Sequence, residues 1–302
     1  MTVRRHGKLF LGGEDGLPFS KGLMTRALMA TGLPAEPAYE LARRAELDLA
    51  RRRTPTIELG RLQELAVDLL GEEAGLAALR RLRSYHELQE LDLPIILLIG
   101  GGTGTGKSTV ATEAAHRLGI TRVTSTDFIR QTMRAFFSKE FMPSIHYSSF
   151  EAQLGLTKAE EEESGDAALL GFLDQSRNVI VGVEAAVRRA LTEGWSMVLE
   201  GVHLVPGMLE AEFDGALVVQ CVLAIHDEET HRSHFWIRDA TSDGVRPADK
   251  YLDAFAEIRL IQDYVVERAR RADVPVVENY AMDDALADVM KLVLDKAERL
   301  TR

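Results

Sequence analysis

This 302-residue chain has a single cysteine, no excess of cationic side chains and no long apolar run. Its single cysteine, Cys221, excludes an intramolecular disulfide framework and a metal site built on clustered cysteines. Lys and Arg number 36 against 47 Asp and Glu, and a net charge of −11 disfavours binding to nucleic-acid phosphates. The longest uncharged apolar runs, 94–100 and 215–225, are far shorter than the roughly 18–20 residues that span a bilayer. We therefore expect a cytoplasmic protein with neither a nucleic-acid nor a membrane partner.

The first 91 residues are predicted to form a small, mostly helical domain. Apolar side chains recur there at helical spacing, at Leu62, Leu65, Ala66, Leu69 and Leu70. An earlier helix is expected after residue 20, where Ser20 provides a capping hydroxyl. The character of the sequence changes near Pro94, and we place a second domain at 92–302.

Five short apolar segments in this second domain are predicted strands. They lie at 94–100, 120–125, 195–200, 216–225 and 274–278. Continuous apolar runs of this length are typical of strands buried on both faces of a parallel sheet. Because helical patterns separate them, we predict an α/β fold with a doubly wound parallel sheet of five core strands.

A glycine-rich segment, GGTGTGKS at 101–108, fits the pattern G-x-x-x-x-G-K-[ST] in full. It follows a predicted buried strand and opens a predicted helix, which is the setting of a phosphate-binding loop (P-loop). Its backbone N–H groups converge on phosphates, Lys107 reaches the β- and γ-phosphates, and the Ser108 hydroxyl binds Mg²⁺. The sequence therefore predicts a P-loop kinase fold that binds ATP or GTP through Gly101, Gly102, Thr103, Gly104, Thr105, Gly106, Lys107, Ser108 and Thr109.

Two carboxylates follow predicted strands of the same sheet. Asp127 comes after the strand at 120–125, and Arg130 stands one helical turn later. We interpret Asp127 as the base or hydroxyl-orienting group and Arg130 as an anion clamp; the alternative is a helix cap paired with an arginine. Glu200 ends the strand at 195–200 and is the second predicted Mg²⁺ ligand, directly or through water. The alternative for Glu200 is a solvent-facing carboxylate.

The polar segment 226–247 lies between two predicted strands, where a P-loop kinase carries a lid. Arg238 is predicted to stabilise charge on the transferred phosphoryl group. The spacing of its histidines, His226, His231 and His234, matches no compelling metal-ligand pattern, so a solvated lid helix is favoured over a metal site. Two further stretches, 134–137 and 143–150, suit either an anionic substrate or an ordinary surface loop.

Beyond the P-loop, several motifs strongly resemble those of the 2-phosphoglycerate kinase family of small-molecule kinases. They run from about residue 94 to 279 and include TSTDFIRQTMR, PSIHYSSFEA, SMVLEGVHLVPG, HRSHFWIR and RPADKYLDAFAEIRLIQDYVVERA. The resemblance implies transfer of the ATP γ-phosphoryl group to the 3-hydroxyl of 2-phosphoglycerate, giving 2,3-diphosphoglycerate and ADP. An anionic acceptor needs cations, for which the candidates are Arg130, Arg134, His146 and Arg177. At His234 a permanently charged lid residue would be expected instead.

The N-terminal segment resembles an ATP-cone, a small helical regulatory module that binds nucleotide. The resemblance rests on VRRHGKLFLGGEDGLPFSKGLMTRAL and TGLPAEPAYELA, and it makes Lys8, Lys21 and Arg26 candidates to face a regulatory nucleotide. A purely structural helical cap is the alternative.

Three functions compete at this point. The first is a Mg-ATP-dependent kinase of a small phosphorylated hydroxy acid, the second a kinase of another acceptor such as a sugar acid or nucleotide, and the third a nucleotide-sensing regulatory protein. The pair Asp127 and Arg130 favours an enzyme, because a sensor needs no acceptor site. The sequence leaves the oligomeric state open.

Overall fold

The computed structural model describes residues 19–91, 93–157, 166–209, 213–241 and 247–301. The chain forms two compact units, one of Met1–Asp92 with Leu286–Arg302 and one of Leu93–Ala285. The C-terminal residues from Leu286 on therefore group with the N-terminal helices, whereas the sequence analysis assigned them to the kinase domain. Lys8 lies outside the described residues.

The first unit is helical, as predicted. It contains α1 (Lys21–Ala30), α2 (Ala35–Arg52), α3 (Leu59–Leu70), α4 (Glu72–Glu90) and most of α12 (Met282–Thr301). Ser20 caps α1 by accepting a bond from the Leu23 N–H, and Leu62, Leu65 and Ala66 of α3 are buried. Lys21 forms an ion pair with Glu46 at 3.2 Å. The helices α3 and α4 approach closely at Gly75, where an added Cβ would lie 2.7 Å from the backbone nitrogen of Val67.

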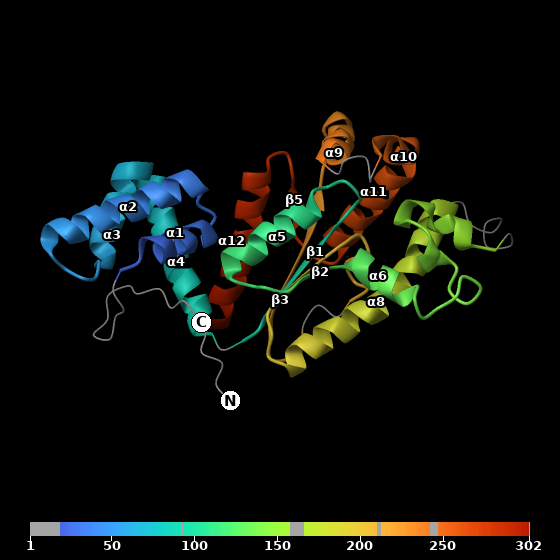
Figure 1. The fold of residues 1–302 in the computed structure, drawn as a ribbon, viewed down its shortest axis with the longest axis horizontal. Coiled ribbons are helices and arrows are strands. Elements are labelled where there is room, and N and C mark those ends of the chain that lie inside the picture. The colour runs from blue at the N-terminus through green and yellow to red at the C-terminus, as the bar shows by residue number, and fades with distance from the viewer. Residues whose placement is uncertain (1–18, 92, 158–165, 210–212, 242–246, 302) are drawn as a thin grey trace. The chain divides into compact units, whose positions relative to one another are not determined.

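The second unit is built on a five-stranded parallel sheet in the order β2-β3-β1-β4-β5 (Figure 1). Its strands are β1 (Ile95–Gly101), β2 (Val123–Ser125), β3 (Met197–Glu200), β4 (Leu217–Ala224) and β5 (Val276–Glu278). All five predicted strands are confirmed, and every residue of β1 is buried, as its uninterrupted apolar run indicated. Cys221 is buried in β4, where burial raises the pKa of its thiol to about 12.

Helices cover both faces of this sheet, which makes it doubly wound. The side chains of Ile96 and Leu98 pack on α8 (Ala167–Thr192), and those of Val222 and Ala224 pack on α11 (Phe255–Arg271). Since these positions have the same parity in paired strands, α8 and α11 share one face. Helix α5 (Lys107–Leu118) lies on the other side of the sheet from α8 and α11 in Figure 1.

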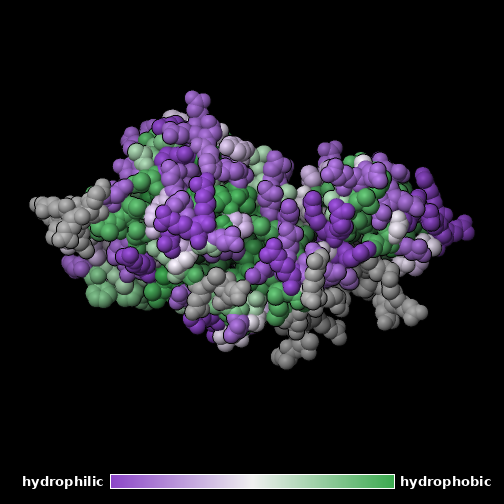
Figure 2. Space-filling model, turned by 180° about the vertical axis from the view of Figure 1, so that it is seen from behind, coloured by the Kyte–Doolittle hydropathy of each residue, from purple (hydrophilic) through white to green (hydrophobic). Residues whose placement is uncertain are grey.

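Shorter helices complete this unit around the edge where the strands end. They are α6 (Thr126–Met133), η1 (Ser144–His146), η2 (Ser149–Gly155), α9 (Glu228–Thr241) and α10 (Ala248–Asp253). Hydrophilic side chains cover much of the surface seen in Figure 2, with apolar ones between them. None of the helices in the described ranges combines the length and apolarity needed to cross a membrane.

Two helical glycines give a matched test of the packing between α3 and α4. Gly75→Ala should lower the free energy of unfolding by about 1–3 kcal/mol, because its methyl group would overlap the α3 backbone. Gly60→Ala, whose Cβ would have nothing within 4 Å, should raise it by about 0.4–1 kcal/mol. Urea unfolding of both variants measures the difference, and equal effects would contradict the close approach.

Candidate active site

The glycine-rich loop predicted to be a P-loop joins β1 to α5 and is shaped by three glycines with positive φ. The φ angles are +138° at Gly101, +87° at Gly104 and +82° at Gly106. The backbone of a residue with a side chain rarely adopts such angles. A Cβ on Gly101 would lie 2.2 Å from the carbonyl oxygen of Leu223 in β4. The loop can therefore turn tightly against the sheet only because these positions lack side chains.

Lys107 lies inside the loop rather than in solvent. Its Nζ donates to the carbonyl oxygen of Gly102 at 2.5 Å, and the residue is 8% exposed. Burial lowers the pKa of Lys107, while the carboxylates of Glu200 and Asp127 oppose that shift and Arg238 adds to it. Three charged side chains are thus close enough to shift the pKa of Lys107, as expected of an active site.

Ser108 and Glu200 meet at the start of α5. The Ser108 hydroxyl donates to Oε1 of Glu200 at 2.9 Å, and Glu200 is 7% exposed. Glu200 arrives there because β3 pairs with β1 in a register that sets it opposite Ile99. A hydroxyl and a carboxylate oxygen are hard ligands that suit Mg²⁺, so this pair fits the predicted metal position. The described residues contain no cluster of three or more His, Cys, Asp or Glu side chains arranged for a metal.

Asp127 and Arg130 stand on α6, which begins directly after β2. The Ser125 hydroxyl caps the helix by accepting a bond from the Phe128 N–H at 3.0 Å, so Asp127 is free of that capping task. The Asp127 side chain is 64% exposed, and its Oδ1 accepts a bond from Arg130 Nε at 3.1 Å. Asp127 is therefore the carboxylate of α6 that is open to an acceptor.

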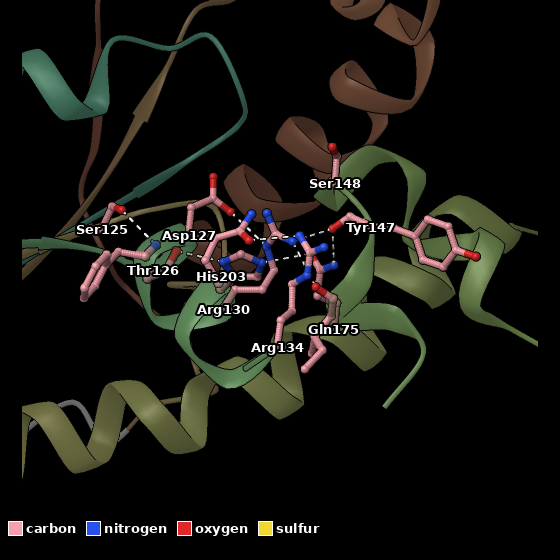
Figure 3. Close-up of polar contacts among 12 residues, drawn as sticks. Ser125, Thr126, Asp127, Arg130, Arg134, Tyr147, Ser148, Gln175 and His203 are labelled. Carbon is pink, nitrogen blue, oxygen red and sulfur yellow. Dashed lines mark hydrogen bonds and ion pairs between the residues drawn. The ribbon is translucent and has the colours of Figure 1, made fainter. Parts of the chain in front are cut away.

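Arg130 is buried and bonds to backbone carbonyl groups of a distant loop. Its Nη1 donates to the carbonyl oxygen of Ile145 at 2.9 Å. It also donates to that of Tyr147 at 2.7 Å (Figure 3). The sequence analysis interpreted Arg130 as an anion clamp and, alternatively, as the partner of Asp127. The structure shows the Asp127 pairing and adds a second contact that spacing along the chain gave no means to foresee.

Asp127 is ionised at neutral pH. Partial desolvation raises its pKa, but His203, Arg130 and Lys107 together bring the pKa below the usual value for a carboxyl group. Burial lowers the pKa of His203 to about 4, so that ring is neutral at pH 7, and Arg130 and Lys107 are the cations that act on Asp127 at that pH. A carboxylate held in this form can accept a hydrogen bond from an acceptor hydroxyl.

A buried histidine that the sequence analysis did not select links α6 to α8. His203 has no exposed surface, and its Nδ1 lies 2.7 Å from the Thr126 hydroxyl. Gln175 Nε2 donates to the carbonyl oxygens of Ser144 and Tyr147, so its Oε1 is left to accept from His203 Nε2 at 2.9 Å (Figure 3). The neutral ring therefore donates at Nε2 and accepts the Thr126 proton at Nδ1.

The other predicted acceptor cations occupy different settings. Arg134 ends α6, is exposed and donates to Gln131 Oε1 at 2.9 Å. His146 Nε2 lies 3.0 Å from the carbonyl oxygen of Phe137 and so donates to the backbone. Arg177 is exposed on α8, about 200° around the helix from Gln175. Arg134 is thus the exposed cation on the same helix as Asp127.

Helix α9 lies against the P-loop and carries Arg238. The guanidinium of Arg238 stacks 5.2 Å from the Tyr251 ring centre, and its charge acts on Lys107. The predicted solvated helix is wrong on one face, because His231 has no exposed surface and Phe235 has 1%. His231 Nε2 and His234 Nδ1 each lie at hydrogen-bond distance from a carbonyl oxygen of the P-loop.

The buried ring of His203 gives a pH dependence of stability. Its pKa is about 4 in the folded protein and near 6.5 in the unfolded chain, so only the unfolded chain gains a proton as the pH falls between them. The free energy of unfolding should therefore fall with decreasing pH, by up to about 1.4 kcal/mol per pH unit from this group. His203→Gln should show a slope smaller by that amount in urea unfolding from pH 6.5 to 5. The exposed His116→Gln serves as control, and equal slopes for His203→Gln and the parent would contradict the assignment.

Comparisons with known proteins place this chain among relatives of one kind, although no model of a protein family matches it. It is 36% identical to the 2-phosphoglycerate kinase of Methanopyrus kandleri over 281 residues, which cover 93% of this chain and 85% of the relative. It is 32% identical to that of Pyrococcus furiosus (96% of this chain, 94% of the relative) and 37% to that of Methanothermobacter thermautotrophicus (91% and 89%). The chain belongs to the 2-phosphoglycerate kinase family.

Proposed function

We propose that this protein transfers the γ-phosphoryl group of ATP to the 3-hydroxyl of 2-phosphoglycerate, giving 2,3-diphosphoglycerate and ADP. The observation that carries the proposal is an exposed, ionised Asp127 beside a buried Lys107 at the carboxyl edge of the sheet. The name shared by the curated relatives supports this choice of acceptor. Phosphoryl transfer of this kind relies on positioning and charge stabilisation, which these groups supply.

The donor half of the site is the P-loop with its metal ligands. Backbone N–H groups of the loop and the Lys107 ammonium group neutralise the phosphates of ATP. Ser108 and Glu200 would hold Mg²⁺, which when bound neutralises charge on the phosphate oxygens. Arg238 on α9 adds a cation whose charge already acts on Lys107.

The acceptor half is formed by α6 and the loop around η1. Asp127 accepts the proton of the attacking hydroxyl and orients its oxygen toward the γ-phosphorus. The acceptor carries a phosphate and a carboxylate, so it needs a cation beyond those that hold ATP. Arg134, exposed one turn beyond Arg130, supplies it, while Arg130 keeps Asp127 and the loop in place.

The direct test is ADP release from Mg-ATP with each of three acceptors and with none. We expect turnover with 2-phosphoglycerate. Turnover with 3-phosphoglycerate and with glycerate should be at least tenfold slower, because the phosphate and the free hydroxyl of the acceptor must occupy fixed positions. Turnover with another acceptor would overturn the substrate assignment. ATP binding without acceptor-dependent turnover would instead favour a nucleotide sensor.

Asp127→Asn should lower kcat with 2-phosphoglycerate by about 10²–10⁴-fold, because an amide cannot accept the hydroxyl proton. The affinity for Mg-ATP should change little, since the carboxylate is assigned to the acceptor. Asp263→Asn, which removes an exposed carboxylate from α11, is the matched control and should leave kcat unchanged. Full activity of the Asp127→Asn variant would show that the Asp127 carboxylate takes no part in the reaction.

Variants of two exposed arginines distinguish an acceptor site at α6 from one on the surface of α8. Arg134→Ala should raise the KM for 2-phosphoglycerate by about tenfold or more, as expected for loss of a charge-assisted hydrogen bond. Arg177→Ala should leave KM within about twofold, because this side chain is on the opposite side of α8 from Gln175, which bonds the loop around η1. Steady-state kinetics at saturating Mg-ATP measures both, and the reverse order of effects would move the acceptor site to α8.

A further inference from the structure

Helix α9 is fastened to the P-loop by two imidazole rings. His231 Nε2 lies 2.7 Å from the carbonyl oxygen of Thr103, and His234 Nδ1 lies 3.0 Å from that of Gly104. A carbonyl oxygen can only accept, so both rings donate an N–H to the loop. The two histidines are three residues apart and therefore occupy the same face of the helix.

The His231 ring is itself held from behind. Its Nδ1 lies 3.5 Å from Nη1 of Arg259. That Nη1 donates to the carbonyl oxygen of Ile225 at 2.6 Å, and Nη2 of Arg259 donates to the carbonyl oxygen of His226 at 3.0 Å. Burial lowers the pKa of His231 to about 4, so the ring is neutral at pH 7 and carries one N–H. With Arg259 facing Nδ1, that N–H is at Nε2 and points at Thr103.

Phe235 of α9 also packs against the loop, at Gly104. A Cβ on Gly104 would lie 2.5 Å from Phe235 Cζ and 3.0 Å from His231 Nε2. The His231 and Phe235 rings stack with centres 5.4 Å apart. Helix α9 thus packs directly on the P-loop backbone at the residue whose missing side chain makes room for it.

The geometry of the peptide bond links these carbonyl contacts to the direction of the backbone N–H groups of the loop. The described residues contain no cis peptide bond, so each C=O and the N–H of the next residue point in opposite directions across one plane. Fixing the carbonyl groups of Thr103 and Gly104 toward α9 therefore fixes the N–H groups of Gly104 and Thr105 away from it. Those N–H groups belong to the cradle in which a P-loop binds phosphates.

We propose that His231 and His234 are positioning residues of the ATP site, which orient the Gly104 and Thr105 N–H groups by holding the carbonyl oxygens on the opposite side of the loop. The proposal rests on nucleotide binding in the proposed function. It also explains why a histidine replaces the cation expected at position 234: this ring binds the loop, not a phosphate.

The same fastening sets the position of Arg238. Residues 231, 234 and 238 follow the i, i+3, i+7 spacing of one helix face, so the turns that hold the loop also direct the arginine toward it. The effect of its charge on Lys107 agrees with this direction.

The test replaces each ring with a side chain that either keeps or loses the donor. His231→Leu and His234→Leu should each raise the Kd for Mg-ATP by about tenfold, the size expected for loss of one hydrogen bond. In His231→Gln the amide nitrogen replaces Nε2, and in His234→Asn it replaces Nδ1, so both should bind within about threefold of the parent. Calorimetric titration without acceptor gives the Kd, and circular dichroism establishes that each variant is folded.

Ser233→Ala, on the exposed side of α9, is the control and should bind Mg-ATP like the parent. Unchanged Kd in both folded leucine variants would overturn the proposal, as would amide variants that bind no better than the leucine variants. A merely structural role predicts equal losses for Leu and for Gln or Asn. Because binding is measured without 2-phosphoglycerate, failure of the acceptor assignment would leave this result interpretable.

Discussion

The candidate active site depends on one buried guanidinium group, that of Arg130. It donates to the Asp127 carboxylate on its own helix and to two backbone carbonyl groups of the loop around η1. A planar fork with several N–H donors can join three groups at fixed angles, which an ammonium group cannot. Arg130 thereby holds Asp127 and the loop around η1 in one fixed arrangement. Gln175 on α8 donates to the same loop, and His203, which follows β3, bonds to Gln175 and to Thr126 of α6.

The donor side of the site follows the same physical rule. Its P-loop is held through outward-facing carbonyl oxygens, by His231, His234 and Asn279, whose Nδ2 donates to Thr105. The backbone N–H groups on the other side of those peptides are the ones that the proposed function assigns to phosphate. In both parts of the candidate site, protein donors are bonded to backbone carbonyl groups.

Local signals carried the prediction of the sheet, the P-loop and Glu200. Each strand was a continuous apolar run, and Glu200 was found because it ends a strand in a parallel sheet, where carboxyl ends gather. The backbone contacts of Arg130 and the contacts of His203 could not be predicted in this way, because the residues they join are 15 or more positions apart along the chain.

Hydrogen exchange in Arg130→Lys tests the central claim that this residue holds the site together. The lysine keeps the charge but loses the fork, so amide exchange at 144–147 should quicken by about tenfold or more. The Kd for Mg-ATP should stay within about twofold, while kcat with 2-phosphoglycerate falls. Unchanged exchange together with a raised KM for 2-phosphoglycerate alone would contradict the account, because it would make Arg130 a ligand of the acceptor rather than the support of Asp127 and its loop.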